Sequence, residues 1–259
     1  MGKKILLKSF KMKYLRVIPS LLLSQNKLVK GVKFSNHKIA GSPGTTITSL
    51  ESQGADEIIL IDIDSYRNKD HKIDLNYLKE ITKNCQTPIT YGGGIDTVKK
   101  GVDVIKSGFE KIYLNRILLK NPKILREFSN NLGSQAIVAG INLTKKDERY
   151  KIYEDKNNKY ELIDYINLIQ EMGIGEIKIT FVDYEGTKKG FDINFLKKLS
   201  EYIKVSSIYE GGIGSLDHLN DAFSNGASAI ALGTMITFKD YNIIKIKKFL
   251  KNQGYKIRV

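Results

Sequence analysis

The sequence predicts a single-domain α/β protein, a (β/α)8 TIM barrel built from two similar halves. Short β-branched or apolar runs alternate with amphipathic stretches along the chain, which is typical of parallel strands covered by helices. The chain has 259 residues, of which 41% are hydrophobic, and single α/β barrels commonly contain about 250 residues. We therefore expect one barrel domain over residues 12–259.

Eight segments have the length and composition of strands, which is the number that closes such a barrel. The stretches between them have helical periodicity; Ile193, Leu196 and Leu199, for example, share one helix face because they are three residues apart. The expected strands are residues 14–19, 57–62, 88–91, 111–114, 136–141, 176–181, 205–209 and 229–232.

The second half of the sequence repeats the first in order and spacing. The segment GADEI at 54–58 corresponds to GIGEI at 173–177, and YGGGI at 91–95 corresponds to YEGGI at 209–213. In both halves, another glycine follows the last glycine of the second motif after the same interval, since 108 − 94 = 14 and 226 − 212 = 14. The repeat predicts two fused half-barrels.

Two polar segments interrupt this rhythm, residues 21–43 after the first expected strand and residues 142–160 after the fifth. In a barrel, both would be loops at the C-terminal face, where ligands bind. Residues 1–11 form a Lys-rich N-terminal extension of the expected barrel, and Met12 is an equally good start.

Basic residues exceed acidic ones by 42 − 28 = 14, so the chain attracts anions. The lysines are scattered along predicted helices, which favours solvated helix faces over a nucleic-acid site. No apolar run approaches the ~18 residues that cross a bilayer, so no membrane partner is expected. Cys85 is the only cysteine, which excludes an intrachain disulfide and suits a cytoplasmic protein. No metal ion or cofactor is expected.

Gly-rich turns after predicted strands indicate anion binding. The run Gly92-Gly93-Gly94 precedes a predicted helix, so its backbone N–H groups can face an anion without obstruction by side chains. Gly211-Gly212 occupies the corresponding place in the second half, and Gly233-Thr234 follows the last strand. Because the two turns are related by the repeat, we expect an elongated phosphorylated ligand with two anionic ends.

Several short motifs occur in one order between Arg16 and the C-terminus: RVIP (16–19), VKGV (29–32), GADE (54–57), GGGI (92–95), SQ (134–135), DYEGT (183–187) and GG (211–212). In these motifs, nearly the whole chain resembles the cyclase subunit family of imidazole glycerol phosphate synthase. The resemblance implies that ammonia from a HisH-like glutaminase subunit on the N-terminal face passes through the barrel to a phosphorylated substrate at the C-terminal face. It also completes the expected set of phosphate-binding residues, which is Gly93, Gly94, Asn115, Arg116, Gly186, Thr187, Gly211, Gly212, Gly233 and Thr234.

The resemblance implies a ring of charged residues that gates the channel entrance. Its positions are occupied here by Arg16, Glu57, Lys111 and Glu176, and all four have the expected charge. Two acids and two bases can neutralise one another, which matters because unpaired charges at a barrel mouth are costly to desolvate. The alternative is that four ordinary strand-start residues form a network that only stabilises the fold.

The sequence departs from the family at the two aspartates that act as its general acid and base. Leu22 and Asn142 occupy these positions, and neither side chain exchanges a proton near neutral pH. General acid–base catalysis is commonly worth ~10²–10⁴-fold, so we expect negligible cyclisation. Arg116 and Glu210 also replace small residues. Arg116 would strengthen one phosphate site, and Glu210 would repel a phosphate at the other unless it points away or binds a sugar hydroxyl.

Three functional interpretations follow. The departures fit a paralogous branch that works with a glutaminase-like subunit and an ATP-dependent amidotransferase to convert an acetamido group of a surface-polysaccharide sugar to acetamidino. The second interpretation is a histidine-pathway cyclase with displaced catalytic groups, and the third is a non-catalytic scaffold that binds a phosphorylated ligand. Carboxylates at strand ends are often structural; those that could act as replacement acids or bases are Glu210, Asp62, Asp183 and Glu185.

Overall fold

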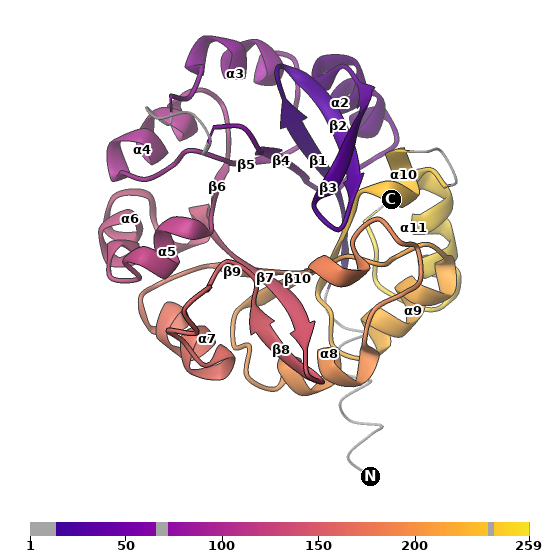
Figure 1. The fold of residues 1–259 in the computed structure, drawn as a ribbon. Helices are drawn as coiled ribbons and strands as arrows, with labels where there is room; N and C mark the ends of the chain where they lie inside the picture. The colour runs from indigo at the N-terminus through magenta and orange to yellow at the C-terminus, as the bar shows by residue number, and fades with distance from the viewer. Residues whose placement is uncertain (1–13, 66–71, 238–240, 259) are drawn as a thin grey trace.

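The computed structural model describes residues 14–65, 72–237 and 241–258, and over these residues the chain forms the predicted barrel. Figure 1 shows a closed ring of parallel strands with helices around its outside. The predicted extension, residues 1–11, lies outside the described residues. The strands, in ring order, are β1 (Arg16–Ser24), β4 (Ile58–Asp62), β5 (Ile89–Gly92), β6 (Lys111–Leu114), β7 (Ile137–Lys146), β9 (Glu176–Phe181), β10 (Ser206–Glu210) and β11 (Ala229–Leu232).

The ring closes because β1 pairs in parallel with β11, with Arg16 beside Ala229. Helices follow the strands and bury one face against them; α9, for example, buries Leu219 and Phe223. No helix of the described residues is long and apolar enough to cross a membrane. The helices are α2 (Pro43–Ser52), α3 (Leu75–Thr82), α4 (Val98–Lys106), α5 (Arg116–Lys120), α6 (Ile124–Leu132), α7 (Leu162–Glu171), α8 (Ile193–Ser200), α9 (Leu216–Ser224), α10 (Thr234–Thr237) and α11 (Ile243–Asn252), with 3-10 turns η1 (Ser134–Ala136) and η2 (Val182–Tyr184).

The two segments predicted as polar loops contain β-hairpins instead. β1 continues past the barrel and pairs with β2 (Lys27–Val32), which in turn pairs with β3 (Ser35–Gly41). β7 likewise continues and pairs with β8 (Arg149–Ile152). Both hairpins rise from the C-terminal ends of barrel strands, where the loops were expected, and their strands are an addition that the sequence analysis did not predict.

Backbone conformation explains why the sequence does not signal these hairpins. Their turns have positive φ at both central residues: 48° and 60° at Gln25 and Asn26, and 50° and 60° at Asp147 and Glu148. Positive φ at both positions gives a two-residue turn whose twist matches the flanking strands, and Asn-Gly or Asp-Gly is its usual sequence signal. Neither turn contains glycine, so the usual signal is absent.

The two half-barrels have matching local geometry. Gly93 and Gly94 have φ of 123° and 66°, and Gly211 and Gly212 have φ of 106° and 87°. A Cβ atom on Gly93 would lie 2.5 Å from the carbonyl oxygen of Asp62, at the end of the preceding barrel strand, so glycine is required there. The helix after each turn begins with a hydroxyl cap, Thr97 for α4 and Ser215 for α9.

Candidate functional site

Four charged side chains form a closed network inside the N-terminal end of the barrel. Arg16 on β1 donates hydrogen bonds to Glu57 and Glu176. Lys111 on β6 bridges the same two carboxylates, with Nζ 2.8 Å from Glu57 Oε2 and 2.9 Å from Glu176 Oε2. The structure therefore brings the four predicted ring residues together in one alternating arrangement of charge.

The ring is partly shielded from solvent, with side-chain exposures from 8% to 20%. Burial by itself would raise the pKa of Glu176, but Arg16 and then Lys111 outweigh it and hold that pKa below its ordinary value. Burial likewise opposes the charge on Arg16, and the two glutamates more than compensate by raising its pKa. Arg16 and Glu176 thus stay charged because each has partners of opposite sign.

Above the ring, the barrel interior is largely apolar. Along β1, side chains of every second residue face inward, so Arg16 in the ring is followed by Ile18, by the buried Ser20 and then by Leu22, which lines a cavity. Ile18 belongs to a small buried cluster separate from the larger core between strands and helices. The other buried members of this cluster are Ile59, Tyr113, Val138, Ile208, Ala229 and Ala231.

A buried ion pair lies between this apolar layer and the cavity. Lys178 on β9 is 1% exposed and donates hydrogen bonds to Glu210 on β10 and to the Thr180 hydroxyl, the latter at 2.8 Å. Its ammonium lies 5.3 Å from the centre of the Tyr113 ring, within range of a cation–π contact. Burial disfavours both charges, yet Lys178 lowers the pKa of Glu210 and Glu210 raises the pKa of Lys178. Glu210 therefore has an internal partner and does not point a lone negative charge at a ligand.

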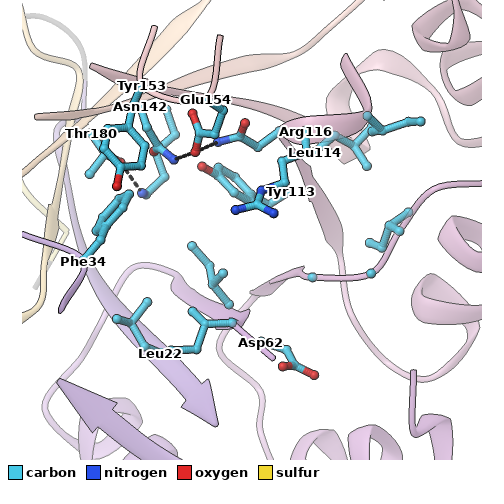
Figure 2. Close-up of a pocket in the computed structure, with 18 of the residues that line it drawn as sticks. Leu22, Phe34, Asp62, Tyr113, Leu114, Arg116, Asn142, Tyr153, Glu154 and Thr180 are labelled. Carbon is cyan, nitrogen blue, oxygen red and sulfur yellow. Dashed lines mark hydrogen bonds between the residues drawn. The ribbon is translucent and has the colours of Figure 1, made fainter. Parts of the chain in front are cut away.

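A cavity of about 600 Å³ opens at the C-terminal ends of the strands. Figure 2 shows Leu22 and Asp62 on one side of it and Tyr113, Asn142 and Glu154 on the other. Leu22 and Asn142, the two positions where the resemblance led us to expect aspartates, therefore face the same space, to which they bring an isobutyl group and an amide. Leu22 cannot exchange a proton, and Asn142 can only donate or accept hydrogen bonds.

Asn142 is held by a residue that the sequence did not single out. Its side-chain Nδ2 donates to Glu154 Oε1, which also accepts a longer hydrogen bond of 3.4 Å from Asn115 Nδ2. Glu154 follows β8 of the second hairpin and lines the cavity. The cavity therefore contains a carboxylate in direct contact with the asparagine.

The other candidate acids have structural partners. Asp62 Oδ1 accepts backbone N–H bonds from Asp64 and Ser65 at 2.9 and 3.0 Å, and burial raises its pKa although these bonds oppose the shift. Asp183 accepts from Thr144 Oγ1 and from the backbone of Lys145, which ties η2 to the hairpin. Glu185 forms a buried ion pair with Lys30 of β2.

The expected phosphate-binding residues divide between two adjoining spaces. Gly93, Gly94, Asn115 and Arg116 line the large cavity. A smaller space of about 20 Å³ is lined by the residues expected to hold the second anionic end, namely Gly186, Gly211, Gly212, Gly233 and Thr234. Thr187 lines neither space, and its hydroxyl donates to the carbonyl of Tyr184 at 2.7 Å.

The two spaces share Lys30, Glu185 and Glu210, so one elongated ligand could reach both. The Thr234 hydroxyl is buried and has no hydrogen-bond partner among the described residues, which suits a ligand at the small space. Among the described residues, no cluster of three or more His, Cys, Asp or Glu side chains could hold a metal ion.

Fold and site together define an eight-stranded α/β barrel with a charged network at one end and a ligand cavity at the other. Comparison with known proteins assigns it to a family: the model of the "Histidine biosynthesis protein" family matches residues 16–242, and the chain belongs to this family. The chain is 32% identical over 247 residues to imidazole glycerol phosphate synthase subunit HisF of Thermococcus onnurineus, covering 94% of this chain and 98% of that protein.

Other proteins of the same name give similar values. Subunit HisF of Chlorobium phaeobacteroides is 32% identical over 248 residues, and that of Pyrococcus furiosus is 30% identical over 247 residues. Each match covers 94% of this chain and 98% of the relative. The chain is therefore a HisF-like member of the family along nearly its whole length.

Proposed function

We propose that this chain is the barrel subunit of a glutamine amidotransferase complex and conducts ammonia from a HisH-like glutaminase on its N-terminal face to the C-terminal cavity. There, or on an associated ATP-dependent amidotransferase, the ammonia converts an acetamido group of a nucleotide-linked sugar to acetamidino in surface-polysaccharide biosynthesis. The observation that carries this proposal is the intact charged ring below a cavity in which Leu22 and Asn142 occupy the two aspartate positions.

The barrel interior supports passage of a neutral molecule. Between the ring and the cavity, a transported molecule meets the apolar side chains of Ile18, Ile59 and Ile208. An isolated cation in such surroundings is strongly disfavoured, whereas a small neutral molecule loses much less on leaving water. Ammonia therefore fits this interior better than ammonium does.

The cavity supports an anionic acceptor of the size of a nucleotide-linked sugar. Its volume of about 600 Å³ is in the range of pockets that enclose small organic ligands. Arg116 and the Gly93-Gly94 backbone offer donors for a phosphate group, and the small space beyond Lys30 offers a second site.

The name that these relatives share favours a second candidate, which is an imidazole glycerol phosphate synthase subunit in histidine biosynthesis. This function would need an acid and a base at positions other than Leu22 and Asn142. Complementation separates the two candidates. A histidine auxotroph that lacks its own cyclase subunit should not grow when it carries this gene, and growth without histidine would replace our first proposal with the second.

Nitrogen transfer through the ring tests the channel itself. In the complex with its glutaminase, Lys111→Ala should lower transfer of glutamine-derived nitrogen to product more than it lowers glutamine hydrolysis. Lys247→Ala is a matched control, because Lys247 also forms a buried ion pair at this end, 2.8 Å from Asp56, but from the outer helix α11. Equal losses of transfer and hydrolysis in Lys111→Ala would show that the ring only supports the fold.

A further inference from the structure

Glu154 is a carboxylate of the cavity with one anchored oxygen and one buried oxygen that lacks a hydrogen-bond partner among the described residues. Its Oε1 accepts from Asn142 and Asn115, which fixes the side chain against β7 and the end of β6. Its Oε2 is shielded from solvent and has no hydrogen-bond partner within the described chain. The other cavity acids differ: Glu210, Glu185 and Asp96 have lysine partners. Asp62 accepts from the backbone.

An anchored carboxylate of this kind favours the protonated form. Burial raises the pKa of Glu154 above its ordinary value, although the hydrogen bond from Asn142 and the nearby charge of Arg116 act in the opposite direction. A ligand anion beside Arg116 would screen that favourable charge and add a repulsive one, and both effects favour a neutral carboxyl. Protonation would also turn Oε2 from an acceptor into an O–H donor.

Other titratable groups surround Glu154. Tyr113 of β6 and Tyr165 of α7 are close enough for its charge to raise their pKa. The cavity also contains the Lys30–Glu185 and Lys178–Glu210 ion pairs. The remaining charged or titratable groups that line it are His37 of β3, Asp62 of β4, Asp96, Arg116 and Lys120 of α5, and Tyr153. A test of Glu154 must therefore compare variants and not a single pH profile.

We propose that Glu154 takes up a proton from solvent when an anionic group of the ligand binds beside Arg116, and that its Oε2 then donates an O–H hydrogen bond to the ligand. The proposal rests on the anionic ligand of the proposed function and deepens it. It places a proton-carrying group next to Asn142, in a cavity where the two family aspartate positions supply none. The ligand class that it selects is a phosphorylated molecule with a hydrogen-bond acceptor beside its phosphate.

Sulfate binding to the isolated chain tests the proposal, because sulfate keeps its charge throughout the neutral range. Isothermal titration calorimetry in buffers of different ionisation enthalpy counts the protons that accompany binding. For the native chain, we expect proton uptake, and affinity should rise by up to about tenfold per pH unit of acidification where Glu154 is ionised. Glu154→Gln mimics the protonated carboxyl, so this variant should bind sulfate at least as tightly at neutral pH and should take up fewer protons.

Glu148→Gln provides the control, since Glu148 lies on the same hairpin, has a side chain that is 90% exposed and pairs with Lys145. It should take up as many protons as the native chain. Equal proton uptake in Glu154→Gln and the native chain would overturn the proposal while leaving the anion site intact. Failure of the native chain to bind sulfate would instead overturn the anion site and, with it, this role of Glu154. Thermal melting checks that Glu154→Gln is folded. If it is not folded, Glu154→Asp replaces it and must retain proton uptake, with a shifted pH midpoint. Loss of proton uptake in Glu154→Asp would also overturn the proposal.

Discussion

At the N-terminal end of the barrel, charged side chains satisfy one another, whereas at the C-terminal end polar atoms remain without protein partners. Arg16 and Lys111 each contact both Glu57 and Glu176, so every charge of the ring has two neighbours of opposite sign. At the other end, Glu154 Oε2 and Thr234 Oγ1 are buried without hydrogen-bond partners among the described residues. Buried polar atoms usually have partners, so this contrast points to a ligand at the C-terminal end.

The contrast also separates two uses of buried charge. A network that is complete within the protein adds rigidity and position-specific charge without needing a ligand. A site with incomplete pairing is less stable by itself and gains from whatever binds there. We therefore expect substitutions in complete networks to lower stability and substitutions in the cavity to change binding, with smaller effects on folding.

The largest effect is expected at the Lys178–Glu210 ion pair. Lys178→Met would leave Glu210 buried without its lysine, and removal of one partner of a buried pair costs about 3–5 kcal/mol. Urea denaturation of the chain measures this free energy of unfolding. The double variant Lys178→Met with Glu210→Leu should recover most of the loss, because no uncompensated charge remains.

A surface pair provides the reference for that prediction. Lys145→Ala breaks the Lys145–Glu148 pair, whose glutamate is 90% exposed, and should change the free energy of unfolding far less than Lys178→Met does, because solvent screens an exposed pair. A loss in Lys178→Met as small as in Lys145→Ala would contradict the view that the interior pair is a complete and rigid network.

The second effect concerns the ring and appears in acid. The pKa of Glu176 is held below its ordinary value of 4.5, so its contribution to stability is fully present above about pH 4.5 and is lost as pH falls through the lower value of the folded state. Glu176→Gln should lower the free energy of unfolding at pH 7 by about 2 kcal/mol, since the ring is slightly exposed. The difference from the native chain should shrink on acidification, and a constant difference from pH 7 to pH 3 would exclude this origin.

Much of the barrel could be predicted because its signals are local and periodic, and its ring was expected from the family resemblance. The strands at 111–114, 176–181 and 229–232 have the predicted bounds, since each is a short apolar or β-branched run. The ring residues come from strand starts, where a barrel brings inward-facing side chains together. Only their mutual contacts, and not their positions, needed the structure.

The cavity wall could not be predicted in the same way. Glu154 lies in a segment whose hairpin turn has no glycine, so its distance from Asn142 depends on a pairing that the sequence does not signal. Lys178 has a signal that was overlooked, because it stands between Ile177 and Ile179 in an inward register with Glu176. A lysine at such a position in a buried strand requires an acidic partner, and Glu210 on the neighbouring strand is that partner.

A third effect should separate binding from folding at the cavity. Arg116→Ala should weaken sulfate binding by roughly tenfold, because a hydrogen bond to a charged group contributes about 1.5 kcal/mol or more. Arg116→Lys keeps the charge and should retain part of the affinity. Calorimetric titration measures both variants, and unchanged affinity in Arg116→Ala would place the anion elsewhere.

The smallest effect has the opposite sign. The raised pKa of Glu154 means that the folded state favours its protonated form, so the associated stability is present below the ordinary value of 4.5 and is lost as pH rises through the value of the folded state. Where Glu154 is ionised, the folded chain holds a poorly solvated carboxylate, as expected of a site that trades stability for function. Glu154→Gln should raise the free energy of unfolding by about 1 kcal/mol at pH 7 and change it little at pH 4, because the amide resembles the protonated carboxyl. Urea denaturation at both pH values tests this. Lower stability of Glu154→Gln at pH 7 would mean that Glu154 belongs to a complete network like the ring, and the contrast between the two ends of the barrel would not hold.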